Sequence, residues 1–177
     1  MSQHFDEGAI GFDFPDGWNV CRPGESSFYL RHFQKFCGGS KETDFLLYDP
    51  GDRILWMIEV KDYRANERTK QSDLADELAE KTRDSLALLK AAAVNDMNIV
   101  PAAHRQVGTF ARLSSAPAQI RVVLHCELPA SPSKLFPSIK DAANLQTKMD
   151  QKLRPVDPHV LFTNVRMARA LPWTVTA

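Results

Sequence analysis

Two apolar runs near the middle of the chain flank a short polar stretch and predict a β-hairpin. The runs are FLLY and ILWMIEV, and Asp49-Pro50-Gly51-Asp52 lies between them. Proline followed by glycine suits the two central positions of a tight turn. The second run is apolar at successive positions, which is typical of a central strand covered on both faces. The hairpin is therefore expected in the interior of a sheet.

Apolar residues at helical spacing predict helices on both sides of this hairpin. The first begins near Ser26, whose hydroxyl can cap it, and ends before Gly38-Gly39. A longer one carries an apolar stripe that includes Leu74, Leu78 and Leu89, with charged residues around it. Helices are expected at 26–37, 68–93, 101–113 and 133–153, and strands within 1–24 and at 119–128, 159–165 and 173–176. This order predicts an α/β fold, with a central mixed sheet flanked by helices, in a single domain over 1–177.

Composition places the chain among ordinary globular proteins. It has 177 residues, of which 44% are hydrophobic and 25% charged, and no apolar run is long enough to span a bilayer. The N-terminus lacks the basic and apolar regions of a signal peptide. Cys21, Cys37 and Cys126 are widely spaced, which suits a reducing compartment. We therefore expect a cytoplasmic protein without membrane contact.

The hairpin register brings three polar side chains to one face. A two-residue loop pairs Asp49 with Asp52, and counting back pairs Asp44 with Met57. Every second residue of a strand repeats a face, so Asp44, Glu59 and Lys61 point the same way. Asp44 then lies diagonal to Glu59, at about 7–8 Å between backbones. A slip of one residue would separate them.

This grouping indicates phosphodiester chemistry assisted by a metal ion. Two carboxylates supply hard oxygen ligands for Mg²⁺, and the metal acidifies a bound water. Lys61 reaches the same space and can orient that water or donate to phosphate oxygens. Glu59 ends an apolar run, a costly place for a charge without a partner. An exposed ion pair on a strand is the alternative interpretation of Glu59 and Lys61.

These residues resemble the PD-(D/E)XK nuclease superfamily, which has the restriction-endonuclease-like fold. The resemblance rests on Asp44 and, after a hydrophobic strand, on Glu59-Val60-Lys61; Thr43 stands where the family name has proline. It implies a core of helix, three-stranded meander, helix and strand over 10–128, followed by a helix-strand extension at 129–177. It also implies cleavage of nucleic acid that depends on Mg²⁺ or Mn²⁺, with Asp44 and Glu59 as metal ligands and Asp44, Glu59 and Lys61 as catalytic residues.

Other positions are weaker candidates for the same site. Many members of the superfamily place an acidic residue in the first helix, where Glu25 stands, and some place a glutamine after the lysine, where Gln71 stands. A glutamate favoured by the helix dipole and a solvated glutamine are the alternatives. Basic side chains that are expected to follow a nucleic-acid backbone are Arg64, Arg68, Lys70 and Lys41. Arg31, His32 and Lys35 form a second basic group with Lys41.

The expected partner is nucleic acid, DNA rather than RNA, in restriction, repair or mobile-element defence. Net charge is +0, whereas nucleic-acid binders are usually basic, so contact must come from a local patch, a homodimer groove or a partner protein. Two alternatives remain: an inactive binding module on the same fold, and a toxin or effector nuclease that cleaves tRNA. The five histidines lack zinc spacing and no phosphate-binding glycine loop occurs, so neither a zinc hydrolase nor a nucleotide-binding protein is indicated.

Overall fold

A five-stranded mixed sheet forms the centre of the computed structural model, which describes residues 2–65, 68, 72–101, 104–128 and 139–177. Its strands lie in chain order: β3 (Asn19–Cys21), β4 (Phe45–Asp49), β5 (Ile54–Asp62), β6 (Gln119–Glu127) and β7 (Leu161–Thr163). Neighbours are antiparallel from β3 to β5 and parallel from β5 to β7. The predicted α/β class and the central place of β5 are confirmed.

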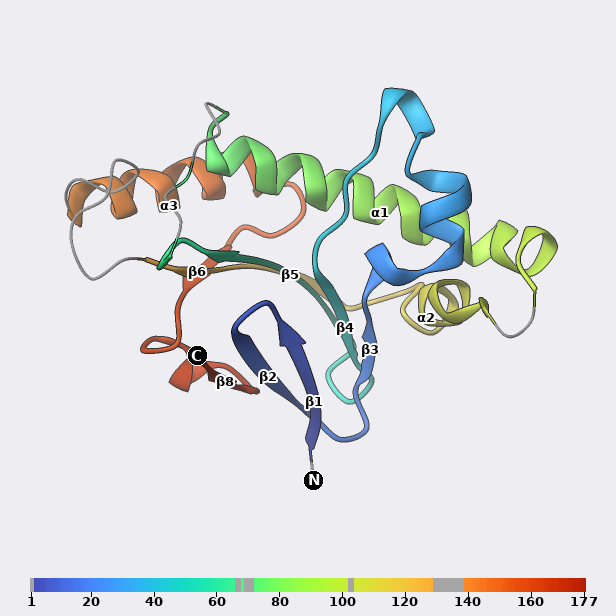
Figure 1. Cartoon of the computed structure of the whole chain (residues 1–177), viewed down its shortest axis with the longest axis horizontal. Helices are drawn as coiled ribbons and strands as arrows, with labels where there is room; N and C mark the ends of the chain where they lie inside the picture. The colour runs from blue at the N-terminus through green and yellow to red at the C-terminus, as the bar shows by residue number, and fades with distance from the viewer. Residues whose placement is uncertain (1, 66–67, 69–71, 102–103, 129–138) are drawn as a thin grey trace.

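The central sheet is covered on both faces. Helices α1 (Leu74–Ile99) and α3 (Ile139–Leu153) lie over one face, and α2 (Gln106–Leu113) packs against α1 (Figure 1). A small antiparallel sheet lies on the other side, with the order β1 (Ser2–Glu7), β2 (Ile10–Pro15) and β8 (Thr174–Thr176). Residues 139–177 thus contribute helix α3, strand β7 of the central sheet and strand β8 of the small sheet.

Strand alternation divides the hydrophobic core into two. Leu46 and Met57 pack toward the helices in what we call the helix-side core. Phe45, Leu47 and Ile58 pack toward the small sheet in the far-side core. Successive side chains of a strand point to opposite faces, so one apolar run serves both cores. This is why β5 is apolar at consecutive positions.

The hairpin register differs from the predicted one by two residues. Asp49 pairs with Ile54 and Phe45 with Ile58, so the loop has four residues rather than two. Asp49 Oδ1 accepts the Gly51 N–H at 2.8 Å, and Arg53 takes a left-handed conformation with φ 55°. These local features extend the turn beyond Pro50-Gly51, and the predicted pairing of Asp44 with Met57 is wrong. A shift of two residues keeps every side chain on its face, however.

The first predicted helix is short and irregular. Its capping residue is confirmed, since Ser26 Oγ accepts the Tyr29 N–H at 3.2 Å. After Ser26 the chain forms a π-helical turn (Tyr29–Phe33) and then a 3-10 turn (Phe36–Gly38). The wider π turn departs from regular α-helical spacing, and Phe33 is buried while Leu30 and Phe36 are exposed.

The remaining elements agree with the predictions in kind and differ at their ends. Helix α1 is described from Leu74 rather than 68, with 69–71 outside the described residues, and it continues to Ile99. Helix α2 begins at Gln106, and strand β6 matches the predicted range closely. Among the residues with described positions, no helix is both long and apolar enough to cross a membrane.

We predict that Trp173 fastens the C-terminal strand to the central sheet. Its ring lies 5.1 Å from that of Trp56 and 5.8 Å from that of Phe14, and the residue is buried. Trp173→Ala should lower the free energy of unfolding by about 3–5 kcal/mol in urea denaturation, because it removes a large buried aromatic ring. Leu113→Ala, at an exposed position, is the control and should change it by less than about 0.5 kcal/mol. Equal effects of the two substitutions would contradict this role.

Candidate functional site

Asp44, Glu59 and Lys61 meet between the central sheet and α1. Asp44 directly precedes β4, and the other two lie near the end of β5. All three have the strand parity of Leu46 and Met57, which pack in the helix-side core. The predicted common face is therefore confirmed, although the register that led to it was wrong by two residues.

A backbone hydrogen bond holds Asp44 against β5. Asp44 Oδ2 accepts the N–H of Val60 at 2.7 Å, and Val60 lies between Glu59 and Lys61. The preceding residue is fastened to α1, since the Thr43 N–H donates to Ser85 Oγ at 3.0 Å. Proline has no N–H and could not make this bond. The departure from the family pattern at Thr43 thus has a structural role in this chain.

Glu59 is the most deeply buried charged group of the site. Its exposed fraction is 0%, and Lys61 and Lys81 both form ion pairs with its carboxylate. Burial and then the Asp44 carboxylate raise the pKa of Glu59, the two lysines lower it, and together they leave the pKa at about 7. A buried carboxylate without these partners would be far costlier.

Lys81, on α1, links the two carboxylates. Its Nζ lies 2.7 Å from Glu59 Oε1 and 2.9 Å from Oε2, and it is 3.9 Å from Asp44 Oδ1. The ammonium therefore occupies the space between Asp44 and Glu59. A single positive charge at this point is shared by two acids that belong to different strands.

Lys61 has acidic partners on both sides. Besides Glu59 it faces Glu77 of α1, whose Oε1 lies 3.4 Å from its Nζ. Burial lowers the pKa of Lys61, but Glu59 and Glu77 outweigh it and hold the pKa above its usual value. Lys61 is therefore an ammonium that can donate hydrogen bonds. Glu77 also pairs with Arg68, at 3.0 Å, so the ion pairs extend from β5 along α1.

The other predicted residues lie apart from this cluster or outside the described residues. Glu25 sits in a 3-10 turn (Pro23–Glu25) and pairs with Arg22 at 2.7 Å. Lys41 Nζ lies 2.5 Å from Glu80, and Arg64 forms a two-point ion pair with Asp62. Arg68 is largely enclosed by Glu77 and Tyr63. Lys70 and Gln71 fall outside the described residues.

Sequence reasoning missed Lys81 and Glu77. Both lie on the covered side of α1, near Leu74, Leu78 and Leu89 of the apolar stripe. Lys81 follows Leu78 by three residues, where an apolar residue is expected in a helix packed on a sheet. That interruption was the available signal, because a charge within a buried stripe needs a partner across the interface.

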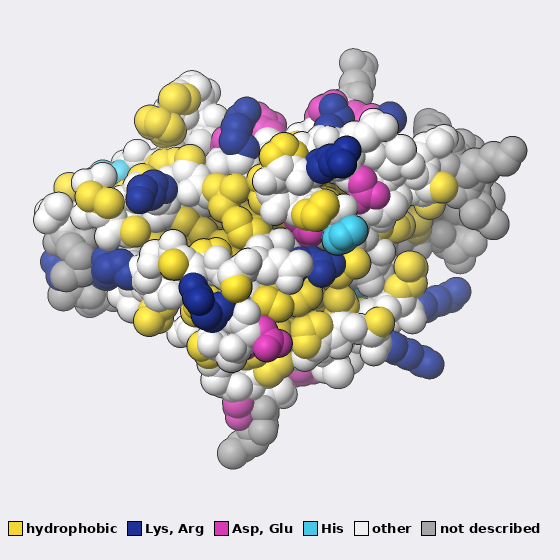
Figure 2. Space-filling model, turned by 180° about the vertical axis from the view of Figure 1, so that it is seen from behind, with side chains coloured by type: hydrophobic (Ala, Val, Ile, Leu, Met, Phe, Trp, Pro, Cys, Tyr) yellow, Lys and Arg dark blue, Asp and Glu magenta, His cyan; other side chains and the backbone are white. Residues whose placement is uncertain are grey.

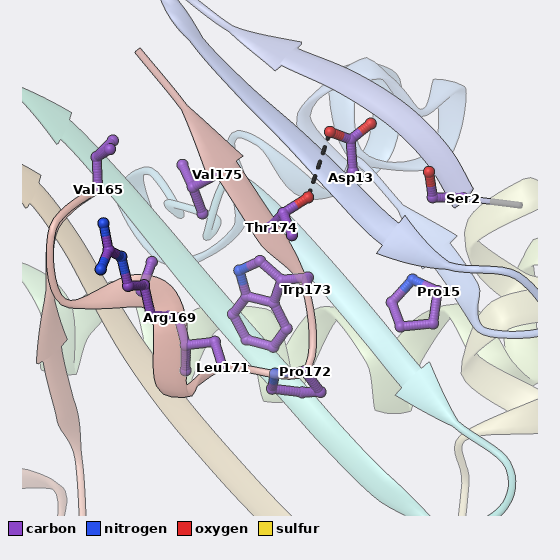
Figure 3. Close-up of a pocket in the computed structure, with 11 residues that line it drawn as sticks. Ser2, Asp13, Pro15, Val165, Arg169, Leu171, Pro172, Trp173, Thr174 and Val175 are labelled. Carbon is purple, nitrogen blue, oxygen red and sulfur yellow. Dashed lines mark hydrogen bonds between the residues drawn. The ribbon is translucent and has the colours of Figure 1, made fainter.

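The surface cavities lined by described residues lie away from this cluster. One, of about 660 Å³, lies beside the small sheet, with Trp173 and Arg169 in its wall (Figure 3). Its carboxylate, Asp13, is engaged by Thr174 Oγ1 at 3.4 Å and by His4 at 2.9 Å. The walls are otherwise mainly apolar, so the cluster under α1 is the better candidate for catalysis.

We predict that Glu59 makes stability depend on pH in metal-free buffer. In the folded protein its pKa is about 7, above the usual glutamate value of 4.5. Between these values the folded state holds a proton that the unfolded state has lost, so stability from this group falls as pH rises from about 4.5 to about 7. The stability of Glu59→Gln relative to the wild type should therefore rise across this window and level off above it.

Urea denaturation with a chelator at several pH values measures this difference. Glu80→Gln, on an accessible part of α1, is the matched control and should show no such trend. A difference between Glu59→Gln and the wild type that is constant with pH would contradict the assignment.

Comparison with known proteins identifies one partial relative and no family. A cysteine–tRNA ligase of Neisseria meningitidis serogroup A / serotype 4A (strain DSM 15465 / Z2491) is 33% identical over 157 residues. The match covers 78% of this chain and 21% of that protein, so the chain spans about a fifth of that relative's length. No family model matches, and no solved structure matches.

Proposed function

We propose that this protein is a metal-dependent nuclease whose site consists of Asp44, Glu59 and Lys61. The observation that carries the proposal is the convergence of two carboxylates and a lysine beneath α1, with Asp44 Oδ2 bound to the N–H of Val60 at 2.7 Å. A structural ion pair would not require a second carboxylate beside a fully buried one. Two adjacent acids repel each other unless a cation lies between them.

The arrangement of elements supports a restriction-endonuclease-like core. Strands β3, β4 and β5 form an antiparallel meander, α1 follows, and β6 returns parallel to β5. This is the order of strands and second helix that the family resemblance implies. One difference concerns the first helical segment, which lies between β3 and β4 rather than before the meander.

The side chains of the site fit a small divalent cation. Asp44 and Glu59 offer hard carboxylate oxygens, and Lys81 already places a positive charge between them. Among the described residues no group of three or more His, Cys, Asp or Glu side chains converges as a metal site. A pair of carboxylates suits Mg²⁺ or Mn²⁺, since Mg²⁺ usually keeps several waters and binds to one or two carboxylates. Lys81 has to leave this space when the ion binds.

Asp44, Glu59 and Lys61 have different roles in the proposed hydrolysis. When bound, the metal acidifies water and offsets charge on the phosphate. Asp44 and Glu59 hold it, and the Val60 N–H fixes the orientation of Asp44. Lys61, with its raised pKa, donates to a phosphate oxygen or to the attacking water. Hydrolysis would form a bond from the water oxygen to phosphorus as one ester P–O bond breaks, and the proton that the water gives up would balance the proton that the leaving oxygen takes up.

RNA is a second candidate substrate. The relative that matches over 78% of this chain is by name a cysteine–tRNA ligase. This observation favours a site that acts on, or binds, tRNA rather than duplex DNA. An inactive module that binds the same nucleic acid would keep the fold and the Lys81 ion pair without cleavage.

We predict that Lys61→Ala and Glu59→Gln each lower Mg²⁺-dependent cleavage by about 100-fold or more, because each removes a group that acts on the transition state. Labelled single-stranded DNA, duplex DNA and tRNA are incubated with Mg²⁺ or with a chelator, and the products are resolved on gels. Lys148→Ala, which removes an exposed lysine paired with Asp73, is the control and should cleave like the wild type. Undiminished cleavage by both site variants would disprove the assignment.

We also predict that Lys81→Met binds Mn²⁺ more tightly than the wild type. The ammonium of Lys81 competes with the ion for Glu59, and methionine has similar length without the charge. Calorimetric titration should show an affinity roughly tenfold higher, equivalent to ~1.4 kcal/mol. Lys90→Met, at an exposed lysine of α1, is the control and should match the wild type. Weaker binding by Lys81→Met would contradict the competition.

A further inference from the structure

Residues 26–41, which we call the basic segment, connect β3 to the start of the site. The segment contains Arg31, Lys35 and Lys41, together with His32, and it has no aspartate or glutamate. The net charge of the chain is +0, and stretches without acidic residues also occur at 97–126 and 158–177, so the basic segment is distinguished by its exposed side chains and not by its length. Figure 1 shows it beside α1 and rising above that helix.

One side of the basic segment is firmly anchored. Phe28, Tyr29 and Phe33 are buried in the helix-side core. Tyr29 donates its hydroxyl hydrogen to the carbonyl of Ser40 at 2.8 Å, and Ser40 Oγ donates to the carbonyl of Phe33. These hydrogen bonds connect the first part of the segment to its last part, so its outward side chains project from an ordered backbone.

The other side of the segment presents apolar and basic side chains to solvent. Leu30 is 51% exposed and Phe36 is 53% exposed. The ring of Phe36 stacks on that of Phe33, with centroids 5.1 Å apart, and so presents its outer face. Phe36 is the one exposed aromatic among the large exposed hydrophobic residues in the described part of the chain. Hydrophobic side chains also stand out on the projection at the upper left of Figure 2.

Two cations of the segment are free of acidic partners. Most Lys and Arg side chains near the site form ion pairs, such as Lys41 with Glu80 and Arg64 with Asp62. In the described residues no ion pair involves Arg31 or Lys35, and both are exposed. They lie four residues apart in the sequence, and Lys35 directly precedes Phe36.

We propose that the basic segment binds a single strand of nucleic acid and leads it to the site at Asp44. Unpaired bases stack on aromatic rings, and neighbouring cations contact the phosphates. Phe36 supplies the ring, and Arg31 and Lys35 supply the charges. Eight residues separate Phe36 from Asp44, which limits their separation to about 28 Å. The path toward the site rests on the proposed nuclease function, whereas strand binding does not.

The test measures fluorescence anisotropy of labelled 12-nucleotide DNA and RNA strands, and of the matching duplex, in chelator and reducing agent. Single strands should bind more tightly than duplex. Phe36→Ala should weaken single-strand binding roughly tenfold, and Phe36→Trp should restore it, since a stacked base contributes appreciably to affinity. Leu113→Ala, at an exposed apolar position on α2, should leave it unchanged.

Salt dependence tests the two cations. In a plot of log affinity against log salt concentration, each phosphate neutralised on a single strand contributes about 0.7 to the steepness of the slope. Replacing both Arg31 and Lys35 with alanine should therefore make the slope less steep by about 1.4. Replacing Lys90 and Arg154, exposed cations elsewhere, should not change it.

Cys37 provides a local readout on the wild-type protein. It is exposed, whereas Cys21 and Cys126 are buried. Bound strand should slow alkylation of Cys37, followed by mass spectrometry.

The outcomes separate this proposal from the nuclease assignment. Equal binding of duplex and single strand, no effect of Phe36→Ala, or no protection of Cys37 would each overturn the role of the basic segment. Absence of binding would overturn it as well. Strand binding without Mg²⁺-dependent cleavage would leave the segment's role intact and contradict the nuclease alone. Cleavage that is unchanged when Phe36, Arg31 and Lys35 are replaced would support the nuclease assignment and contradict the role of the basic segment.

Discussion

The buried carboxylate of Glu59 is the constraint around which this structure is organised. A charge within a mixed sheet, under a long helix, requires ionic or hydrogen-bonding partners close to it. Lys61 supplies one from the same strand, and Lys81 supplies another from α1. Asp44 joins them through the Val60 N–H, so the start of β4, the end of β5 and the first half of α1 are held in one arrangement.

This constraint explains why polar residues interrupt an otherwise apolar interface. Thr43 and Ser85 bond to each other next to the ion pairs, and Glu77 links Lys61 to Arg68. Replacing the whole network of ion pairs by well-packed apolar residues would often cost little stability, whereas removing a single partner would leave a buried charge unpaired and would cost more. Stability alone therefore does not require a network of this size.

The part of the site that depends on strand parity could be predicted from sequence. Asp44 and Glu59 share a face in the predicted register and in the observed one, since a slip of two residues preserves parity. The loop itself could not be predicted, because Arg53 adopts a left-handed conformation that its residue type does not favour. The π turn at Tyr29–Phe33 likewise has no simple sequence signal, and it moved Leu30 and Phe36 to the surface. Lys81 was missed because its partner lies across a tertiary interface.

The net charge of +0 does not show where the charged side chains lie on the surface. On the face seen in Figure 2, Lys and Arg side chains of the described residues are scattered among apolar and acidic ones. Lys41, Arg64, Arg68 and Lys81 are paired with acidic side chains, whereas no ion pair within the described residues involves Arg31 or Lys35 of the basic segment. The central claim is tested most directly by a crystal structure with Mn²⁺. We expect anomalous density between Asp44 and Glu59, with the Lys81 ammonium displaced. An intact Lys81 bridge at saturating Mn²⁺, with no ion on either carboxylate, would contradict it.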